Sequence, residues 1–303
     1  MSEPLVTAII TTYKRPVEII KRAVYSVINQ TYHNWELFVV NDYPEDCILS
    51  SAIDDMLNDF EDSRIHYVCM EKNSGACAAR NRGIGLSSGD YIALLDDDDE
   101  WCPDKITMQL EAFNNENVGL VYSPFYNITD TNKKPQILAR GTSSGNVFNQ
   151  MIYKNIAGGC SMTMFSRKAI DDCGMFDERM LSSQDYDLYI RISEKYEFAY
   201  VAKPLVYRYL LEESITKNSE KQKRGWDLFT EKYQRIYLEH KDAYSYRINR
   251  HVSELIENGD FRQAIHYYRI ALGVKLISKH NVIEPLKGLC KFLGFKNNKD
   301  SKI

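Results

Sequence analysis

The sequence predicts an α/β protein with a mostly parallel, Rossmann-like sheet flanked by helices, followed by an α-helical C-terminal extension. Short apolar runs alternate with amphipathic stretches through the first half, and beyond about residue 217 the apolar spacing is helical throughout. The apolar runs are nearly continuous, as in strands buried on both faces. Strand and helix in alternation indicate parallel pairing with a helix in each crossover. We therefore expect an α/β domain over 1–217 and a helical region over 218–303.

The first half supplies the predicted strands as short apolar runs. These are 5–10, 37–40, 65–70, 91–95 and 118–122. Between them, apolar residues recur at helical spacing in two stretches, 19–28 and 48–60, which predicts an amphipathic helix in each. Alternation of this kind requires each helix to cover one face of the sheet.

The second half contains a further mixed segment and then helices. A strand is predicted at 161–166 and a helix at 184–195, after a Gly-, Ser- and Asn-rich connection at 141–159 that we expect near the functional site. Helical spacing at 252–256 and 261–272, with a turn between them, predicts one helical hairpin.

Charge and cysteine usage exclude several classes of protein. The formal net charge is -4 and the pI about 5.9, which argues against nucleic acid as a partner. The seven cysteines are scattered without metal-binding or paired spacing, which is typical of a reducing compartment. No basic leader precedes the first apolar run, and no run approaches the ~20 residues that span a bilayer. We therefore expect a cytoplasmic protein.

The C-terminal stretch 273–303 is basic and amphipathic. It carries seven lysines against Glu284 and Asp300, interleaved with leucine, isoleucine and phenylalanine. Such a stretch can lie on an anionic membrane surface, which would place the protein at the inner face of the cell membrane. A solvated helix that packs on the α/β domain is the alternative interpretation. Dimerisation through the C-terminal helices is a further hypothesis.

An acidic run directly follows the predicted strand 91–95. Four aspartates and a glutamate occupy 96–100, and such carboxylates repel one another unless a cation is present. Oxygen ligands of this kind suit Mg²⁺ or Mn²⁺ held together with phosphates, although acidic runs are more often solvated loops. Polar residues also follow two other strands, at 11–13 and 41–42. Ligands of parallel sheets bind at the carboxyl ends of the strands, so all three clusters are candidates for one site.

A series of motifs resembles family 2 glycosyltransferases with a GT-A fold. In the family's order, the matching pieces are 7–16 (TAIITTYKRP), 40–42 (VND), 73–75 (NSG), 79–83 (ARNRG), 96–101 (DDDDEW), 174–178 (GMFDE) and 184–188 (QDYDL). The resemblance implies that 1–217 is a GT-A nucleotide-sugar-binding and catalytic domain. It also implies an inverting, non-processive transfer of a sugar to a hydroxyl acceptor, and a glycan or lipid-linked glycan of a bacterial surface polysaccharide as that acceptor.

The resemblance assigns the donor site to four residues outside the acidic run. Thr11, Tyr13 and Asp42 would hold the nucleobase, with the Asp42 carboxylate accepting an imide N–H of a uracil-like ring, so a UDP-sugar is favoured. A turn-forming aspartate is the alternative for Asp42. Arg80 would meet the donor phosphate or base, helped by backbone N–H groups of the preceding turn.

In the acidic run, Asp96 and Asp98 resemble the family's D-x-D motif. The resemblance implies Asp98 as the direct ligand of Mn²⁺ or Mg²⁺ and Asp97 as the residue facing the ribose, with a register open by one residue. Family members often carry a histidine after the Tyr-Arg of the last strand. Here 207–214 has none, and Arg208 and Ser214 are candidates to compensate.

Asp185 resembles the family's catalytic base. It would remove the acceptor hydroxyl proton during a single in-line displacement at the anomeric carbon. A helix N-cap is the alternative role for this aspartate. Two other functions are weighed against the transferase: a nucleotidyltransferase, which normally needs a glycine-rich phosphate loop that 11–16 lacks, and a non-catalytic nucleotide-sugar-binding or assembly protein.

Overall fold

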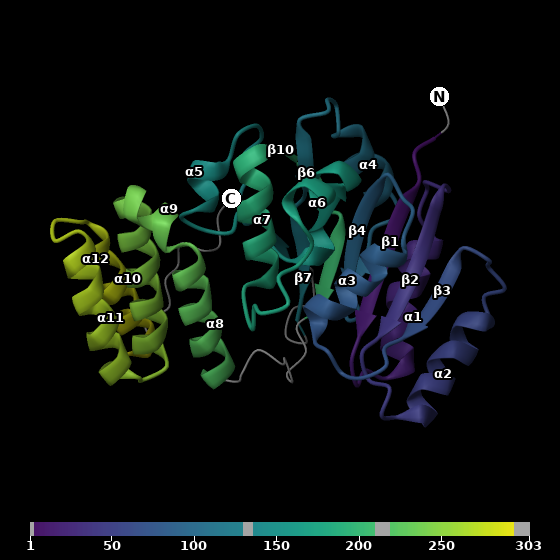
Figure 1. The fold of residues 1–303 in the computed structure, drawn as a ribbon, viewed down its shortest axis with the longest axis horizontal. Coiled ribbons are helices and arrows are strands. Elements are labelled where there is room, and N and C mark those ends of the chain that lie inside the picture. Colours follow the sequence, from purple (N-terminus) through teal and green to yellow (C-terminus); the bar gives the residue numbers. More distant parts are fainter. Residues whose placement is uncertain (1–2, 130–135, 210–218, 294–303) are drawn as a thin grey trace. The chain divides into compact units, whose positions relative to one another are not determined.

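The computed structural model describes residues 3–129, 136–209 and 219–293, drawn as coloured ribbon in Figure 1. The chain divides into two compact units. The first is formed by Met1–Met151 with Asn155–Phe229, and the second by Ile152–Lys154 with Thr230–Ile303. The boundary expected between residues 217 and 218 lies outside the described residues.

A seven-stranded sheet forms the centre of the first unit. Its spatial order is β10-β6-β9-β4-β1-β2-β3. The strands are β1 (Val6–Thr12), β2 (Trp35–Asn41), β3 (Ile65–Cys69), β4 (Tyr91–Asp96), β6 (Val118–Tyr122), β9 (Thr163–Ser166) and β10 (Glu197–Tyr200). All neighbours pair in parallel except β9, which is antiparallel to both β4 and β6. The predicted α/β class with a mostly parallel sheet is confirmed.

Helices connect these strands as the alternating pattern requires. They are α1 (Val17–Ile28), α2 (Cys47–Asn58), α3 (Ala76–Leu86), α4 (Lys105–Glu111), the one-turn α5 (Phe148–Met151), α6 (Arg167–Cys173) and α7 (Gln184–Lys195). The stripe of α1 that was read from the sequence is buried, with Ile20, Ala23, Val24 and Val27 inaccessible to solvent. The helix α7 has the predicted bounds. The predicted strand 161–166 begins later, because Cys160–Met162 form a 3₁₀ turn before β9.

A second, four-stranded sheet was not predicted. Its order is β5-β11-β7-β8, with β5 (Glu100–Trp101), β11 (Val206–Tyr209), β7 (Phe125–Ile128) and β8 (Gln136–Leu138). The strand β5 begins at the last carboxylate of the acidic run and pairs antiparallel with β11. This pairing anchors the far end of the run, as β4 anchors its near end.

The second unit is helical, as expected. Its helices are α9 (Gln234–Glu239), α10 (Lys241–Glu257), α11 (Phe261–Val274) and α12 (His280–Phe292), whereas most of the preceding helix α8 (Ser219–Lys232) belongs to the first unit. Helices α10 and α11 form the predicted hairpin, and the Asp260 carboxylate caps α11 by accepting the Gln263 N–H. The third helix, α12, also packs on α10. Across the ranges described here, no helix combines the length and apolar character needed to span a membrane.

The helix α3 lies very close to β1. A Cβ added at Gly83 would lie 2.7 Å from Ile9 Cγ2, whereas a Cβ at Gly85, two residues further along the same helix, would meet nothing within 4 Å. Ile9 is buried and β-branched, so its methyl group has little freedom to move away. Close packing of α3 on the sheet therefore depends on the missing side chain at position 83.

We expect Gly83→Ala and Gly85→Ala to change stability in opposite directions. The first overpacks the α3–β1 contact and should lower the free energy of unfolding by about 1–3 kcal/mol. The second adds helix propensity at an exposed position and should raise it by about 0.5–1 kcal/mol. The midpoints of urea unfolding measure both changes in stability, provided that the dependence of the unfolding free energy on urea concentration is unchanged. Equal effects of the two substitutions would contradict this account of the helix packing.

Candidate active site

Three strand ends meet at one edge of the large sheet. Thr11 of β1 is in register with Val40 of β2 on one side and with Asp96 of β4 on the other. The parallel pairing therefore brings the polar residues after β1, β2 and β4 side by side, with β1 in the middle. This edge is the carboxyl end of the strands, where parallel sheets bind their ligands.

The acidic run after β4 alternates between buried and accessible carboxylates. The side chains of Asp96 and Asp98 are 39% and 28% exposed, whereas Asp97 and Asp99 are buried. Burial raises the pKa of Asp97 to about 6 and the pKa of Asp99 to about 8. Burial and the neighbouring Asp96 also raise the pKa of Asp98. The run is thus a site that favours an added positive charge.

Two arginines, one before α1 and one within it, already supply part of that charge. The Arg15 guanidinium donates through Nε to Asp97 and through Nη2 to Asp98, both at 3.1 Å. Arg22 of α1 donates to the backbone carbonyl of Asp98 at 2.6 Å and stacks on the Tyr209 ring. The sequence reasoning missed both residues, although Arg15 belongs to the 7–16 motif.

Arg80 joins the acidic run to the start of α7. From α3, its guanidinium donates to the Asp96 carboxylate at 3.0 Å and to the Gln184 side-chain oxygen at 3.2 Å. Gln184 immediately precedes Asp185, the candidate base. One side chain therefore connects β4, α3 and α7, and it is 13% exposed.

Asp185 occupies the first turn of α7. Its carboxylate accepts the Tyr186 N–H at 2.8 Å and lies 3.4 Å from the Asn155 side-chain nitrogen. Burial raises its pKa above the usual range of an aspartate, although Arg80 and the adjacent N–H oppose the shift. The helix N-cap is instead Ser183, in the left-handed region at φ 55°, with no side-chain cap bond. Asp185 is therefore not the N-cap residue of α7.

A buried ion pair holds α7 in place behind Asp185. The Asp187 side chain is fully buried and accepts two bonds from Arg191, one turn later. The same guanidinium donates to the carbonyl groups of Cys173, Gly174 and Met175. These contacts fix the segment after α6 against the helix that carries Asp185.

Asp42 is more constrained than the sequence suggests. Its buried carboxylate accepts the backbone N–H of Ser74 through one oxygen and that of Gly75 through the other, both at 2.8 Å. The turn before α3 thus gives these two N–H groups to Asp42, so they are not free for a donor phosphate as was expected. A ligand of Asp42 would have to use the remaining lone pairs.

Tyr13 is part of an aromatic and cationic cluster. Its ring meets the Tyr43 ring edge to face, with centroids 5.3 Å apart. The Lys14 ammonium lies over both rings, 5.2 Å and 4.7 Å from their centroids. Tyr43 and Lys14 were not assigned from the sequence. Their positions in the sequence could have indicated them, because Tyr43 directly follows the 40–42 motif and Lys14 lies inside the 7–16 motif.

The carboxylates fit a divalent cation only in part. Among the described residues, no three His, Cys, Asp or Glu side chains converge to hold a metal ion by themselves. Asp96 and Asp98 are the accessible oxygen donors, and one or two carboxylates completed by substrate phosphates are the usual Mg²⁺ arrangement. The donor set therefore suits a metal that binds together with a diphosphate. Of the residues named to compensate for the missing histidine, Ser214 lies outside the described residues, and Arg208 is on β11.

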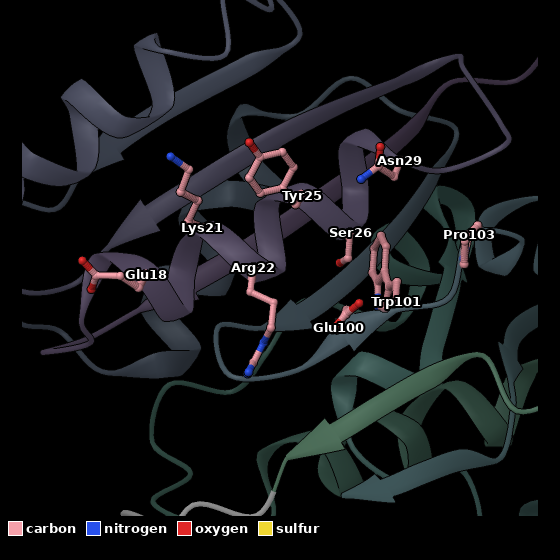
Figure 2. Close-up of a pocket in the computed structure, with 9 residues that line it drawn as sticks. All are labelled: Glu18, Lys21, Arg22, Tyr25, Ser26, Asn29, Glu100, Trp101 and Pro103. Carbon is pink, nitrogen blue, oxygen red and sulfur yellow. The ribbon is translucent and has the colours of Figure 1, made fainter. Parts of the chain in front are cut away.

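A separate hollow of about 460 Å³ lies between α1 and the segment after the acidic run. Figure 2 shows Glu18, Lys21 and Arg22 of α1 with Glu100 and Trp101 among the residues that line it. None of the residues assigned to the donor site lines this hollow. Arg22 links the two places, because it lines the hollow and donates to Asp98.

The fold and the strand-end site define the class of the protein. A mostly parallel sheet, a smaller second sheet and a carboxylate run after β4 are the architecture of the GT-A fold. A solved structure shares this fold: TarS of S. aureus aligns with a TM-score of 0.54 at 13% identity. The alignment covers 94% of this chain and 54% of TarS, so the chain spans about half of that protein's length.

Sequence comparison identifies the family. The family described as glycosyl transferase family 2 matches residues 7–174. WcaA of Escherichia coli K12, a putative colanic acid biosynthesis glycosyl transferase, is 32% identical over 64% of this chain and 68% of its own. TuaG of Bacillus subtilis, a putative teichuronic acid biosynthesis glycosyltransferase, is 29% identical over 76% and 88%. WfgD of E. coli, a UDP-Glc:α-D-GlcNAc-diphosphoundecaprenol β-1,3-glucosyltransferase, is 29% identical over 75% and 86%. The chain belongs to glycosyl transferase family 2, and it is a glycosyltransferase that uses a nucleotide-sugar donor.

We expect Asp42→Asn to destabilise the protein in the absence of any nucleotide. An asparagine can accept only one of the two N–H groups, so one hydrogen bond to a charged carboxylate is lost, at a cost of about 1.5–3 kcal/mol. The control is Asp46→Asn, because Asp46 caps α2 with a single bond that asparagine makes equally well. Urea unfolding measures both. A stable Asp42→Asn variant that has lost nucleotide binding would assign Asp42 to ligand binding alone.

Proposed function

We propose that this glycosyltransferase moves a sugar from a UDP-sugar to a hydroxyl of a lipid-linked glycan, with inversion at the anomeric carbon. The observation that carries the proposal is the Arg80 bridge. It links the accessible carboxylate Asp96 to Gln184, the neighbour of Asp185, which supports one connected site for the proposed diphosphate contact and the candidate base. The UDP-linked, lipid-linked chemistry is supported by the name of the relative WfgD.

Asp185 would act as the general base. Its half-buried carboxylate makes one short hydrogen bond, to the Tyr186 N–H, so lone pairs remain for an acceptor hydroxyl. Arg80 lies close enough to favour the ionised form. The base would take the hydroxyl proton as the acceptor oxygen forms its bond to the anomeric carbon and the bond to the diphosphate breaks.

The donor would bind across the ends of β1, β2 and β4. Thr11, Tyr13 and Asp42 remain the proposed base-binding residues, and the Tyr13–Tyr43 pair offers an aromatic surface for stacking. Asp97 is the least suited of the predicted donor contacts, since it is buried and paired with Arg15.

Asp98, with Asp96, would hold Mn²⁺ or Mg²⁺ together with the donor diphosphate. The alternation of burial along the run supports this register, because Asp97 and Asp99 point away from solvent. When bound, the cation would neutralise negative charge that grows on the leaving diphosphate. Arg15 and Arg80 would then be free to share that role with their remaining donors.

Family membership sets aside the nucleotidyltransferase hypothesis and leaves the non-catalytic binding protein as the alternative outcome. An assay of donor hydrolysis and of transfer to a lipid-linked acceptor separates them. Native protein should release UDP, and Asp185→Asn should do so roughly 10² to 10⁴ times more slowly while still binding UDP. Binding of UDP without turnover by the native protein would support the binding function instead.

We expect UDP to bind in a Mn²⁺-dependent way and Asp98→Asn to weaken that binding roughly tenfold or more. Without nucleotide, Mn²⁺ should bind weakly, because no three carboxylates converge in the part of the chain that the structure describes. Titration calorimetry measures the binding of UDP, and the electron paramagnetic resonance signal of Mn²⁺ measures the binding of the metal ion. The control is Asp104→Asn, an aspartate outside the run that pairs with Lys203. Equal loss in both variants, or tight Mn²⁺ binding without nucleotide, would contradict the shared site.

The pH dependence of kcat/KM should contain an acidic limb due to Asp185. The base works only when ionised, so activity is lost as the pH falls through its pKa, which burial holds above the usual ~3.9. The limb should therefore lie above the range of an exposed aspartate. It should vanish in Asp185→Asn and persist in Asp171→Asn, a change at an exposed position on α6. An unchanged limb in Asp185→Asn would assign it to another group.

A further inference from the structure

Helix α12 has its polar side buried and its apolar side exposed. The buried residues are Asn281, Glu284 and Gly288. Asn281 accepts from the Asn249 side chain of α10 at 2.7 Å. A Cβ at Gly288 would lie 2.5 Å from the Ser253 carbonyl oxygen, so the two helices are in close backbone contact. Polar and small residues therefore fix the helix to α10.

The opposite side of α12 carries a continuous apolar stripe. Val282, Leu286, Leu289 and Leu293 recur at the spacing i, i+4, i+7 and i+11, and their side chains are between 41% and 59% exposed. A helix that uses its apolar stripe for folding would turn it toward the protein. This stripe serves no such purpose among the described residues.

The connection before α12 extends this apolar character. Leu276 and Ile277 are adjacent and are 72% and 89% exposed. Exposing two aliphatic side chains to this extent is unfavourable, because hydrating apolar surface costs free energy. We call Leu276, Ile277 and the four stripe residues together the α12 surface.

The segment 261–293, which contains the α12 surface, carries an excess of cations. From residue 261 to 293 the cations are Arg262, Arg269, Lys275, Lys279, Lys287 and Lys291, and the one acidic residue is Glu284. Glu284 is buried and paired with Lys287, while Lys275 and Lys291 pair with Asp242 and Glu257 of α10. Lys279, two residues after Ile277, is exposed. The chain as a whole has a net charge of -4, so this positive segment is a local feature.

We propose that the α12 surface docks on an anionic lipid bilayer, with the aliphatic side chains at the boundary of the acyl chains and the lysines among the headgroups. Apolar side chains flanked by cations match the two layers of such a surface. A second copy of the chain is a poorer partner, because a two-fold contact of this surface would bring together two segments that each carry six cations and one acidic residue, Glu284, which is already paired with Lys287. The proposal stands on this surface and does not depend on the transferase activity.

Co-sedimentation of the full chain with vesicles tests the proposal without nucleotide. The protein should bind vesicles that contain phosphatidylglycerol, bind pure phosphatidylcholine vesicles more weakly, and dissociate as salt is raised. Ile277→Ser and Leu286→Ser should each lower the partition coefficient roughly tenfold. Lys279→Glu should lower it roughly fivefold or more.

Matched substitutions in the first unit serve as controls. Ile48→Ser changes an aliphatic residue of α2 that is 80% exposed, and Lys168→Glu changes an exposed lysine of α6. Both should bind vesicles as the native chain does, and unchanged urea midpoints would show that the α12 variants are folded. Asp185→Asn should also bind normally, so failure of the transferase mechanism and failure of this proposal are separate results.

Absence of binding to phosphatidylglycerol vesicles would overturn the proposal, as would equal binding by the native chain and the α12 variants. A concentration-dependent dimer in sedimentation velocity, lost in Leu286→Ser and without vesicle binding, would assign the surface to a second copy instead.

Discussion

Arginine side chains from three separate elements hold the carboxylates after β4 together. Arg15 from the connection after β1 binds Asp97 and Asp98, Arg22 from α1 binds the Asp98 carbonyl, and Arg80 from α3 binds Asp96. Consecutive aspartates behind a buried strand repel one another, and burial adds a desolvation cost to each charge. The three arginines offset part of the repulsion among these carboxylates. The positions of α1 and α3 relative to β4 are therefore part of the electrostatics of the site.

The sheets hold the same run at both ends. At its start, Asp96 is the last residue of β4 and its N–H donates to the Ser161 hydroxyl. At its end, β5 pairs with β11, and the Trp101 indole donates to the Ser161 carbonyl. A loop of aspartates would otherwise be free to spread apart and lower its repulsion. Fixing both ends keeps the carboxylates close, which is the condition for binding a cation with a diphosphate.

The strands and long helices could be predicted because burial leaves a periodic trace in the sequence. Strands buried on both faces are continuous apolar runs, and α7 has a clear helical stripe, so 184–195 was predicted with its correct bounds. The second sheet was missed because its strands are only two to four residues long. The insertion of β9 between β4 and β6 is a long-range choice that no local pattern records.

The partners of the site residues were harder to predict than the residues themselves. The motifs pointed to Asp42, Arg80 and Asp96, but the Arg15–Asp97 bond joins residues 82 positions apart. The two bonds from the 74–75 turn to Asp42 depend on how β2 and α3 meet. In each case the chemistry of a residue is local, whereas its hydrogen-bond partner is set by the topology of the sheet.

The separation of charge along the chain has a consequence for how such a protein would approach an anionic surface. The net charge of -4 makes the chain outside 261–293 negative overall, whereas that segment carries six cations against Glu284. At physiological ionic strength the screening length is roughly 8 Å, so only charges that come close to the surface matter. Repulsion elsewhere then does little to oppose docking through the α12 surface. Repulsion of the negative regions does disfavour the other orientations of the protein on the surface. A modest attraction of the α12 surface is therefore enough to give one defined orientation.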